Sequence, residues 1–86
     1  MYVVKRIVGL PGDRIQIRGG LLYRNGEAVS DGLPLIVDAG IAENMVLLAP
    51  GQYFLLGDNR NHSRDSREYG PVPASFITNR ILFRIF

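Results

Sequence analysis

The sequence contains no cysteine, a single histidine and no long apolar run. Without cysteine there are no disulfide bonds and no thiolate metal sites, and no cluster of histidine and carboxylate residues has metal-ligand spacing. No stretch approaches the roughly 18 apolar residues needed to cross a bilayer, and the amino terminus lacks the apolar core of a secretory signal. We therefore expect the chain to work without a metal or other cofactor.

The net charge is also small, because 10 basic residues are offset by 8 acidic ones, which leaves +2. No run of like charges occurs, so nucleic acid is not an expected partner. The chain has 86 residues, of which 47% are hydrophobic. This length and composition predict one small β domain spanning residues 1–86.

The residue pattern predicts strands throughout and no amphipathic helix of useful length. Residues 2–8 are rich in β-branched side chains, Arg14–Arg18 alternates polar and apolar residues, and Asn25-Gly26 favours a type I′ hairpin turn. Further strands are expected at 21–24, 27–29, 45–49, 52–56 and 77–86. We expect a loop with at most one short element at 30–44, a loop at 58–70 and a helical turn at 73–76. These elements predict an all-β fold in which mostly neighbouring strands pair into a small antiparallel, partly open barrel-like sheet.

The first strand is expected to be the weak point of this sheet. If residues upstream belong to the same protein, one edge of the strand at 2–8 would be without its partner. An exposed apolar edge favours pairing between chains, so this edge is a candidate site of self-association.

Two motifs carry the most information in the sequence. The first is Val4–Asp13 (VKRIVGLPGD), and the second is Gly57–Val72 (GDNRNHSRDSREYGPV). Together they resemble the lysine-bearing and GDN-bearing motifs of the bacterial type I signal peptidases of family S26, which cut leader peptides from exported proteins with a Ser/Lys dyad. The resemblance is strong over residues 2–30 and 50–73 and weaker over 31–49, where the short middle part indicates a compact member.

The family also carries a serine motif, Ser-Met-x-Pro, upstream of its lysine, and these 86 residues do not contain that motif. The resemblance therefore implies the carboxy-terminal part of a catalytic domain, which holds the general base without the nucleophile. Ser63 and Ser66 lie in the GDN motif and are not expected to act as nucleophiles. His62 is a lone histidine in a polar loop, which is more often solvated than catalytic. We expect the isolated chain to be inactive as a peptidase.

Lys5 is the residue that the resemblance assigns as the general base. In a strand, alternate side chains share a face, so Lys5 lies between the apolar neighbours Val3 and Ile7. Removal of water from an ammonium group lowers the pKa of a lysine, and a neutral lysine can accept a proton from a serine hydroxyl. An ordinary strand lysine would instead keep its charged head in water.

The resemblance assigns supporting roles to residues around this lysine. Ser63 matches the serine that hydrogen-bonds the lysine and orients it. Asp65 and Arg67 match a carboxylate–guanidinium pair that braces the loop, and such a pair can be bidentate. Asp58 matches another supporting position, and we expect it to pair with Arg6.

Val3 and Val4 precede the lysine and match residues that line the substrate groove of the family. There the leader binds as an added strand whose small side chains at −1 and −3 enter shallow pockets, and Val4 is the better candidate for the −1 wall. Alternatively, both valines are ordinary core or edge-strand residues. The resemblance implies signal peptides of exported preproteins as substrates, a membrane anchor outside these residues, and a location on the extracytoplasmic side of the bacterial plasma membrane.

Two other interpretations stay open at this point. The chain could be a non-catalytic β-module, either a degenerate paralogue or a module that binds peptides or itself. An upstream Ser-Met-x-Pro segment in the gene would favour the enzyme over that module. A self-cleaving Ser/Lys domain of the SOS-repressor type shares the dyad, but the long loop with Ser63, Asp65 and Arg67 does not suit it.

Overall fold

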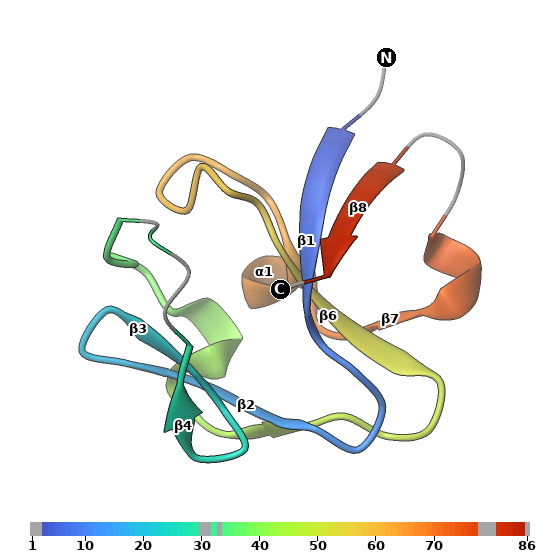
Figure 1. The fold of residues 1–86 in the computed structure, drawn as a ribbon, viewed down its shortest axis with the longest axis horizontal. Helices are drawn as coiled ribbons and strands as arrows, with labels where there is room; N and C mark the ends of the chain where they lie inside the picture. Colours follow the sequence, from blue (N-terminus) through green and yellow to red (C-terminus); the bar gives the residue numbers. More distant parts are fainter. Residues whose placement is uncertain (1–2, 30–31, 33, 78–80, 86) are drawn as a thin grey trace.

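The computed structural model describes residues 3–29, 32, 34–77 and 81–85, and of Val3, Val4 and residues 81–85 it gives the backbone alone. In this part of the chain, eight strands form two four-stranded sheets (Figure 1). The first sheet has the order β7 (Val72–Pro73), β6 (Gln52–Leu56), β1 (Val3–Gly9) and β8 (Ile81–Ile85). The second has the order β4 (Glu27–Ala28), β3 (Leu21–Arg24), β2 (Arg14–Arg18) and β5 (Val46–Leu47).

The expected all-β fold is confirmed. Among the described strands all pairings are antiparallel except that of β1 with β8, which run parallel with Lys5 opposite Phe83. The hydrogen-bonded order of these strands leaves two separate sheets and no closed barrel. Sequence neighbours pair in β2–β3, β3–β4 and β6–β7, but β1 pairs with the distant β6 and β8, which the residue pattern did not predict.

We expected one edge of β1 to lack a partner, and the structure pairs one edge of this strand along most of its length and the other only in part. β8 covers one edge over Val3–Ile7, and β6 covers the other over Arg6–Gly9 (Figure 1). These two neighbours pair much of the backbone of β1, and self-association through an edge of this strand stays a prediction. Within the described ranges, the backbone of residues 3–5 stays unpaired on the β6 side, because pairing with β6 begins only at Arg6.

The hairpin predicted at Asn25-Gly26 is present between β3 and β4. Asn25 has a φ of 54° and Gly26 a φ of 86°, as a type I′ turn requires. The strands predicted at 14–18 and 52–56 are present with those bounds, whereas the strand predicted at 45–49 is reduced to the two residues of β5.

Short helices occupy three connections. η1 (Gly40–Glu43) lies in the middle segment, and η2 (Ala74–Phe76) is the helical turn predicted after Pro73. The expectation of an irregular chain throughout 58–70 is wrong at α1 (Ser66–Tyr69), because the Asp65 carboxylate accepts from the Arg67 N–H and caps this single turn. None of the helices in the described residues has the length and apolarity needed to cross a membrane.

The main core lies between the two sheets. Its buried members come from both sheets and from the segments that join them: Val8, Ile15, Ile17, Leu22, Ile36, Ala42, Leu48, Phe54 and Leu56. Ile7, Leu55 and Val72 form a smaller cluster. Ile7 and Val8 are consecutive in β1 but belong to different clusters, so β1 is buried on both faces. Packing on both faces therefore holds the strand that carries Lys5.

Candidate active site

Lys5 projects from the face of β1 that also carries Ile7, as the alternation of a strand requires. The residue is only 8% exposed. Its Nζ donates a hydrogen bond of 2.6 Å to the main-chain carbonyl oxygen of Arg64. Because a buried amine without a partner would be costly, this carbonyl is what allows the lysine head to remain inside the protein.

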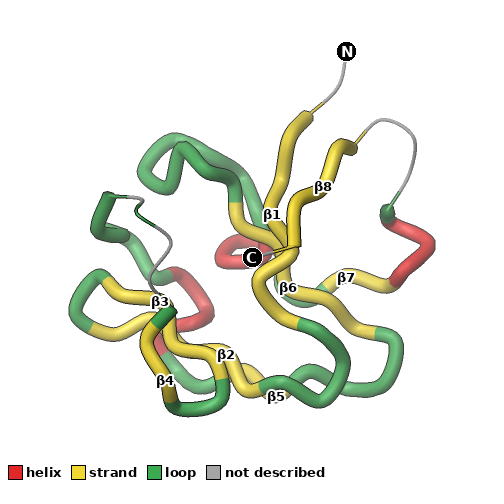
Figure 2. The backbone as a smooth tube through the Cα atoms, in the orientation of Figure 1, coloured by secondary structure: helices red, strands yellow, loops and turns green. Residues whose placement is uncertain are grey.

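The partner carbonyl belongs to the segment that follows β6, which we call the GDN loop (residues 57–65). Figure 2 shows it as a long connection between β6 and the helix α1. Gly57 is the first residue of the loop and lies close to Lys5 and Ser63. A Cβ at Gly57 would collide with the Ser63 hydroxyl and would lie 3.6 Å from Lys5 Nζ. Glycine at this position therefore permits the close approach of loop and lysine.

Ser63 lies next to the lysine, but its hydroxyl donates a hydrogen bond to a different group. Its Oγ donates to Asp65 Oδ2 at 2.8 Å, while Lys5 Nζ donates to the Arg64 carbonyl. No Lys5–Ser63 hydrogen bond is present among the described residues. The Ser63 oxygen also accepts a hydrogen bond of 3.4 Å from Arg67 Nη2, so Asp65 and Arg67 together hold this hydroxyl beside Gly57.

Asp65 is the centre of the loop, and its carboxylate is almost completely buried at 1% exposure. Arg67 contacts it in a bidentate manner, with Nε 2.9 Å from Oδ1 and Nη2 2.8 Å from Oδ2. The Gly57 N–H donates to Oδ2 at 3.0 Å. Burial acts to raise the pKa of Asp65, but the hydrogen bonds from Arg67, the Gly57 N–H and Ser63 outweigh it and lower the pKa.

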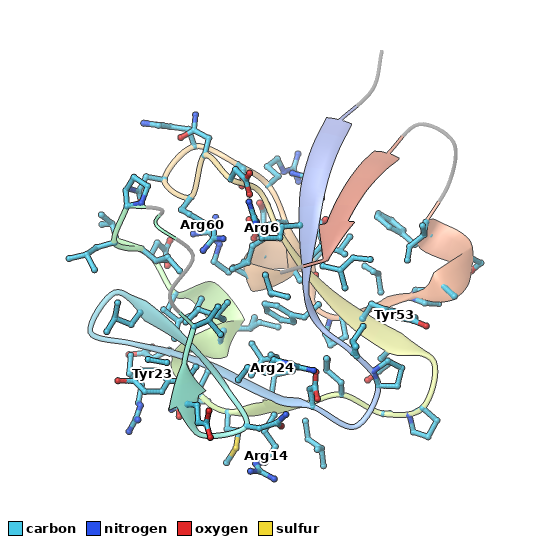
Figure 3. The ribbon with its side chains drawn as sticks, in the orientation of Figure 1. Arg6, Arg14, Tyr23, Arg24, Tyr53 and Arg60 are labelled. Carbon is cyan, nitrogen blue, oxygen red and sulfur yellow. The ribbon has the colours of Figure 1, made fainter. Side chains whose placement is uncertain are left out.

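Arg6 and Asp58 form the ion pair that we expected between the two motifs. Arg6 Nε lies 2.9 Å from Asp58 Oδ1 and Nη2 lies 3.1 Å from Oδ2. Figure 3 shows the Arg6 side chain beside the GDN loop, with the buried Arg60 next to it on the side of the second sheet. The pair joins the strand of Lys5 to the start of the loop.

Two contributors to the site were not found from the sequence. One is the Arg64 carbonyl, because a main-chain acceptor leaves no trace in residue identity. The other is Asn61, whose side-chain amide contacts the backbone of Leu35 and Val37. Nothing in the sequence pattern relates Asn61 to a segment more than twenty positions earlier.

The remaining predicted residues are placed as follows. The side chains of Val3 and Val4 lie outside the described residues, so the groove wall they were expected to form stays a prediction. The side chain of His62 is exposed in the GDN loop. Among the residues that the structure describes, no three His, Cys, Asp or Glu side chains come together in a way that could hold a metal ion.

Comparison with known proteins decides the family. The model of the family described as signal peptidase, peptidase S26, matches residues 1–86. The chain belongs to this family. It is 34% identical over 83 residues to the probable signal peptidase I-1 of Synechocystis sp., covering 96% of this chain and 42% of that protein. It is 36% identical over 94 residues to signal peptidase I of Bacillus caldolyticus, covering 94% of this chain and 52% of that protein.

A solved structure supports the same family at the level of the fold. The chain is similar to a signal peptidase I from Enterococcus faecalis V583, with a TM-score of 0.63 and 28% sequence identity. The match covers 83% of this chain and 74% of the other. The chain spans about two fifths to half of the length of the two curated relatives named above.

Proposed function

We propose that this chain is the base-bearing part of a serine endopeptidase that cleaves signal peptides from exported proteins by a Ser/Lys dyad, with Lys5 as the general base. The observation that carries the proposal is the burial of Lys5, with its Nζ held 2.6 Å from the Arg64 carbonyl inside the GDN loop. Lysine is almost never fully buried unless it is paired, and a desolvated amine in a peptidase family is suited to proton transfer.

The proposed reaction needs a serine from a part of the enzyme that these 86 residues do not include. Lys5 in its neutral form takes the proton of that hydroxyl while the serine oxygen attacks the carbonyl carbon of the scissile peptide bond. The resulting ammonium then donates its proton to the leaving amine, which releases the mature protein and leaves an acyl-enzyme. Water, deprotonated by Lys5 in the same way, hydrolyses the ester and restores the serine.

Supporting roles follow from the contacts around the lysine. Ser63, Asp65 and Arg67 keep the loop and its Arg64 carbonyl in place, and Arg6 with Asp58 holds the loop to β1. The unpaired backbone of residues 3–5 on the β6 side offers three positions where an extended leader could add as a strand, beside Val3 and Val4.

We further propose that the 86 residues alone do not hydrolyse peptides, because a base cannot replace a nucleophile and its oxyanion donors. The parent enzyme would act at the extracytoplasmic side of the bacterial plasma membrane, held there by an anchor outside these residues. Purified chain should not cleave a peptide with Ala-x-Ala before the scissile bond. Turnover that disappears in Ser63→Ala would contradict these role assignments.

The decisive test is a chimera in which residues 1–86 follow the upstream segment of the Bacillus caldolyticus signal peptidase I. We expect it to cleave the Ala-x-Ala peptide, and we expect Lys5→Met to lower kcat/KM by about a thousandfold or more. Arg14→Met, which removes an exposed cation from β2, is the matched control and should retain the rate. A Lys5→Met chimera that processes at the original rate would refute the proposal.

A further inference from the structure

We propose that Asn61 is a positioning residue for Lys5, which it serves by holding the GDN loop against residues 35–40 of the middle segment. This inference rests on the proposed function of Lys5. The Asn61 side chain makes two hydrogen bonds to that segment: Oδ1 accepts from the Val37 N–H at 3.0 Å, and Nδ2 donates to the Leu35 carbonyl at 3.3 Å. Its amide thus satisfies one backbone acceptor and one backbone donor of that segment at the same time.

A second contact between loop and segment lies beyond the other end of the loop. Arg67 Nη1 donates to the Asp38 carbonyl at 3.2 Å. Gly40 approaches the backbone of Arg67 so closely that a Cβ there would overlap its carbonyl group. Between the Asn61 and Arg67 contacts lies an open hollow of about 540 Å³, lined by Val37, Asp38 and Gly40 on the side of the segment.

Residues 35–40, which we call the supporting segment, are themselves fixed to the core. The Ile36 side chain is buried in the main cluster, and its N–H donates to the Gly20 carbonyl at 2.9 Å. The Gly40 N–H donates to Asp38 Oδ1 at 2.9 Å. The supporting segment can therefore act as a fixed base for the loop, because its own backbone is held from the opposite side.

The connection to Lys5 runs through the Arg64 carbonyl. Arg64 lies between the Asn61 contact and Asp65, so both directions of the chain leading to it are held by hydrogen bonds. A neutral lysine amine has two N–H donors and one lone pair. When one donor is fixed on the carbonyl, the directions open to the lone pair are restricted, which aligns it for proton transfer. No contact between Asn61 and Lys5 is present in the described residues, so its effect is indirect.

The first test measures the amine directly in the 86-residue chain. Lys5 is the only lysine in the sequence, so selective ¹⁵N-lysine labelling gives one side-chain amine signal in NMR. We expect Asn61→Ala to accelerate exchange of the Lys5 amine protons with water by about tenfold, because the Arg64 carbonyl is no longer held. Asn44→Ala, an exposed asparagine at the end of η1, is the matched control and should leave the exchange rate unchanged.

Asn61→Asp keeps an acceptor for the Val37 N–H and loses the donor to Leu35. It should accelerate the Lys5 exchange by a smaller factor than Asn61→Ala, and it decides the question if the alanine variant does not fold. If Val37 exchange rises in these variants while the Lys5 amine keeps its rate, Asn61 merely holds the supporting segment, and the proposal is wrong.

The second test uses the chimera and separates positioning from binding. Asn61→Ala should lower kcat by about tenfold or more with KM unchanged, since the substrate groove is not altered. A rise in KM at constant kcat would contradict the proposal. If the chimera shows no Lys5-dependent cleavage at all, the proposed function fails, while the exchange of the Lys5 amine still decides whether Asn61 positions it.

Discussion

Two buried aspartates, one in each motif, accept similar sets of hydrogen bonds in different surroundings. Asp13 accepts hydrogen bonds from the Leu10 N–H at 2.8 Å, from Arg24 Nε at 2.8 Å and from Asn25 Nδ2 at 3.0 Å. Asp65 accepts from a comparable set in the GDN loop. The guanidinium partner differs most, because the Arg24 side chain is 34% exposed and the Arg67 side chain only 8%.

The more exposed pair, Asp13–Arg24, stabilises the fold, whereas the buried pair, Asp65–Arg67, stabilises the candidate site. Asp13 holds the turn between β1 and β2 to the end of the β3–β4 hairpin, where water can partly replace a lost contact. Asp65 holds the end of β6, the GDN loop and α1 around Lys5, where water has little access. Removal of one partner from a buried pair leaves an uncompensated charge, which costs more than the same change near the surface.

The largest expected effect comes from Asp65→Asn. This change leaves the Arg67 guanidinium buried without its counter-charge, and we expect it to lower the free energy of unfolding by about 3–5 kcal/mol. Urea denaturation followed by circular dichroism measures the loss.

Asp38→Asn is the matched control, since it makes the same chemical change at an exposed carboxylate and keeps an oxygen for the Gly40 N–H. The control should change stability by less than about 0.5 kcal/mol. Equal losses in both variants would mean that burial of the Asp65–Arg67 pair does not increase its contribution to the free energy of unfolding.

Asp13→Asn should have a smaller effect of about 1–3 kcal/mol, measured in the same way. The new amide group would replace one carboxylate oxygen and would face either the Asn25 donor or the donors of Leu10 and Arg24, so at least one hydrogen bond is lost. Arg24 is partly exposed and can turn to water. A loss as large as that of Asp65→Asn would show that exposure of the arginine does not distinguish the two sites.

The smallest expected effect is the change in the free energy of unfolding as the pH is lowered. Burial acts to raise the pKa of Asp13, but hydrogen bonds from Asn25, the Leu10 N–H and Arg24 lower it overall, and the pKa of Asp65 is lowered as well. A carboxyl with a lowered folded-state pKa stabilises the fold above its ordinary pKa, and this contribution is lost as the pH falls through the folded value. We therefore expect the free energy of unfolding to be level near neutral pH and to fall below about pH 4.

Each asparagine variant should flatten this acid dependence, and Asp65→Asn should flatten it more because its ion pair is less exposed. Urea denaturation between pH 2 and pH 7 gives the curves. Curves of identical slope in the unchanged chain and in both variants would contradict the assignment of these carboxylates as the source of acid sensitivity.

Much of the fold could be read from local patterns. The turn at Asn25-Gly26, the strand at 14–18 and the helical turn after Pro73 depend on backbone preferences of a few consecutive residues, and these were predicted correctly. The pairing of β1 was not, because the residues of a strand do not encode which distant strand lies beside it. The helical turn at 66–69 was missed for a related reason, since its cap at Asp65 lay in a segment whose composition resembled an irregular loop.

The candidate site shows the same division. Lys5, Arg6, Asp58, Asp65 and Arg67 were found from motif spacing, and the contacts Arg6–Asp58 and Asp65–Arg67 exist as expected, while the roles of these residues stay predictions. The acceptor of Lys5 and the contacts of Asn61 were not found. Main-chain acceptors and side-chain contacts to a distant backbone depend on which segments the tertiary fold brings together. Residue types alone do not specify this.

The sequence by itself determined the family, the strands and the identity of the charged groups, because motif spacing and local backbone preference act over a few residues. Only the tertiary structure decided that β8 runs parallel to the lysine strand, that the Arg64 carbonyl accepts from Lys5, and that the middle segment supports the loop. These features join residues far apart in the chain, and their stability comes from burial and hydrogen bonds that exist only once the sheets have packed.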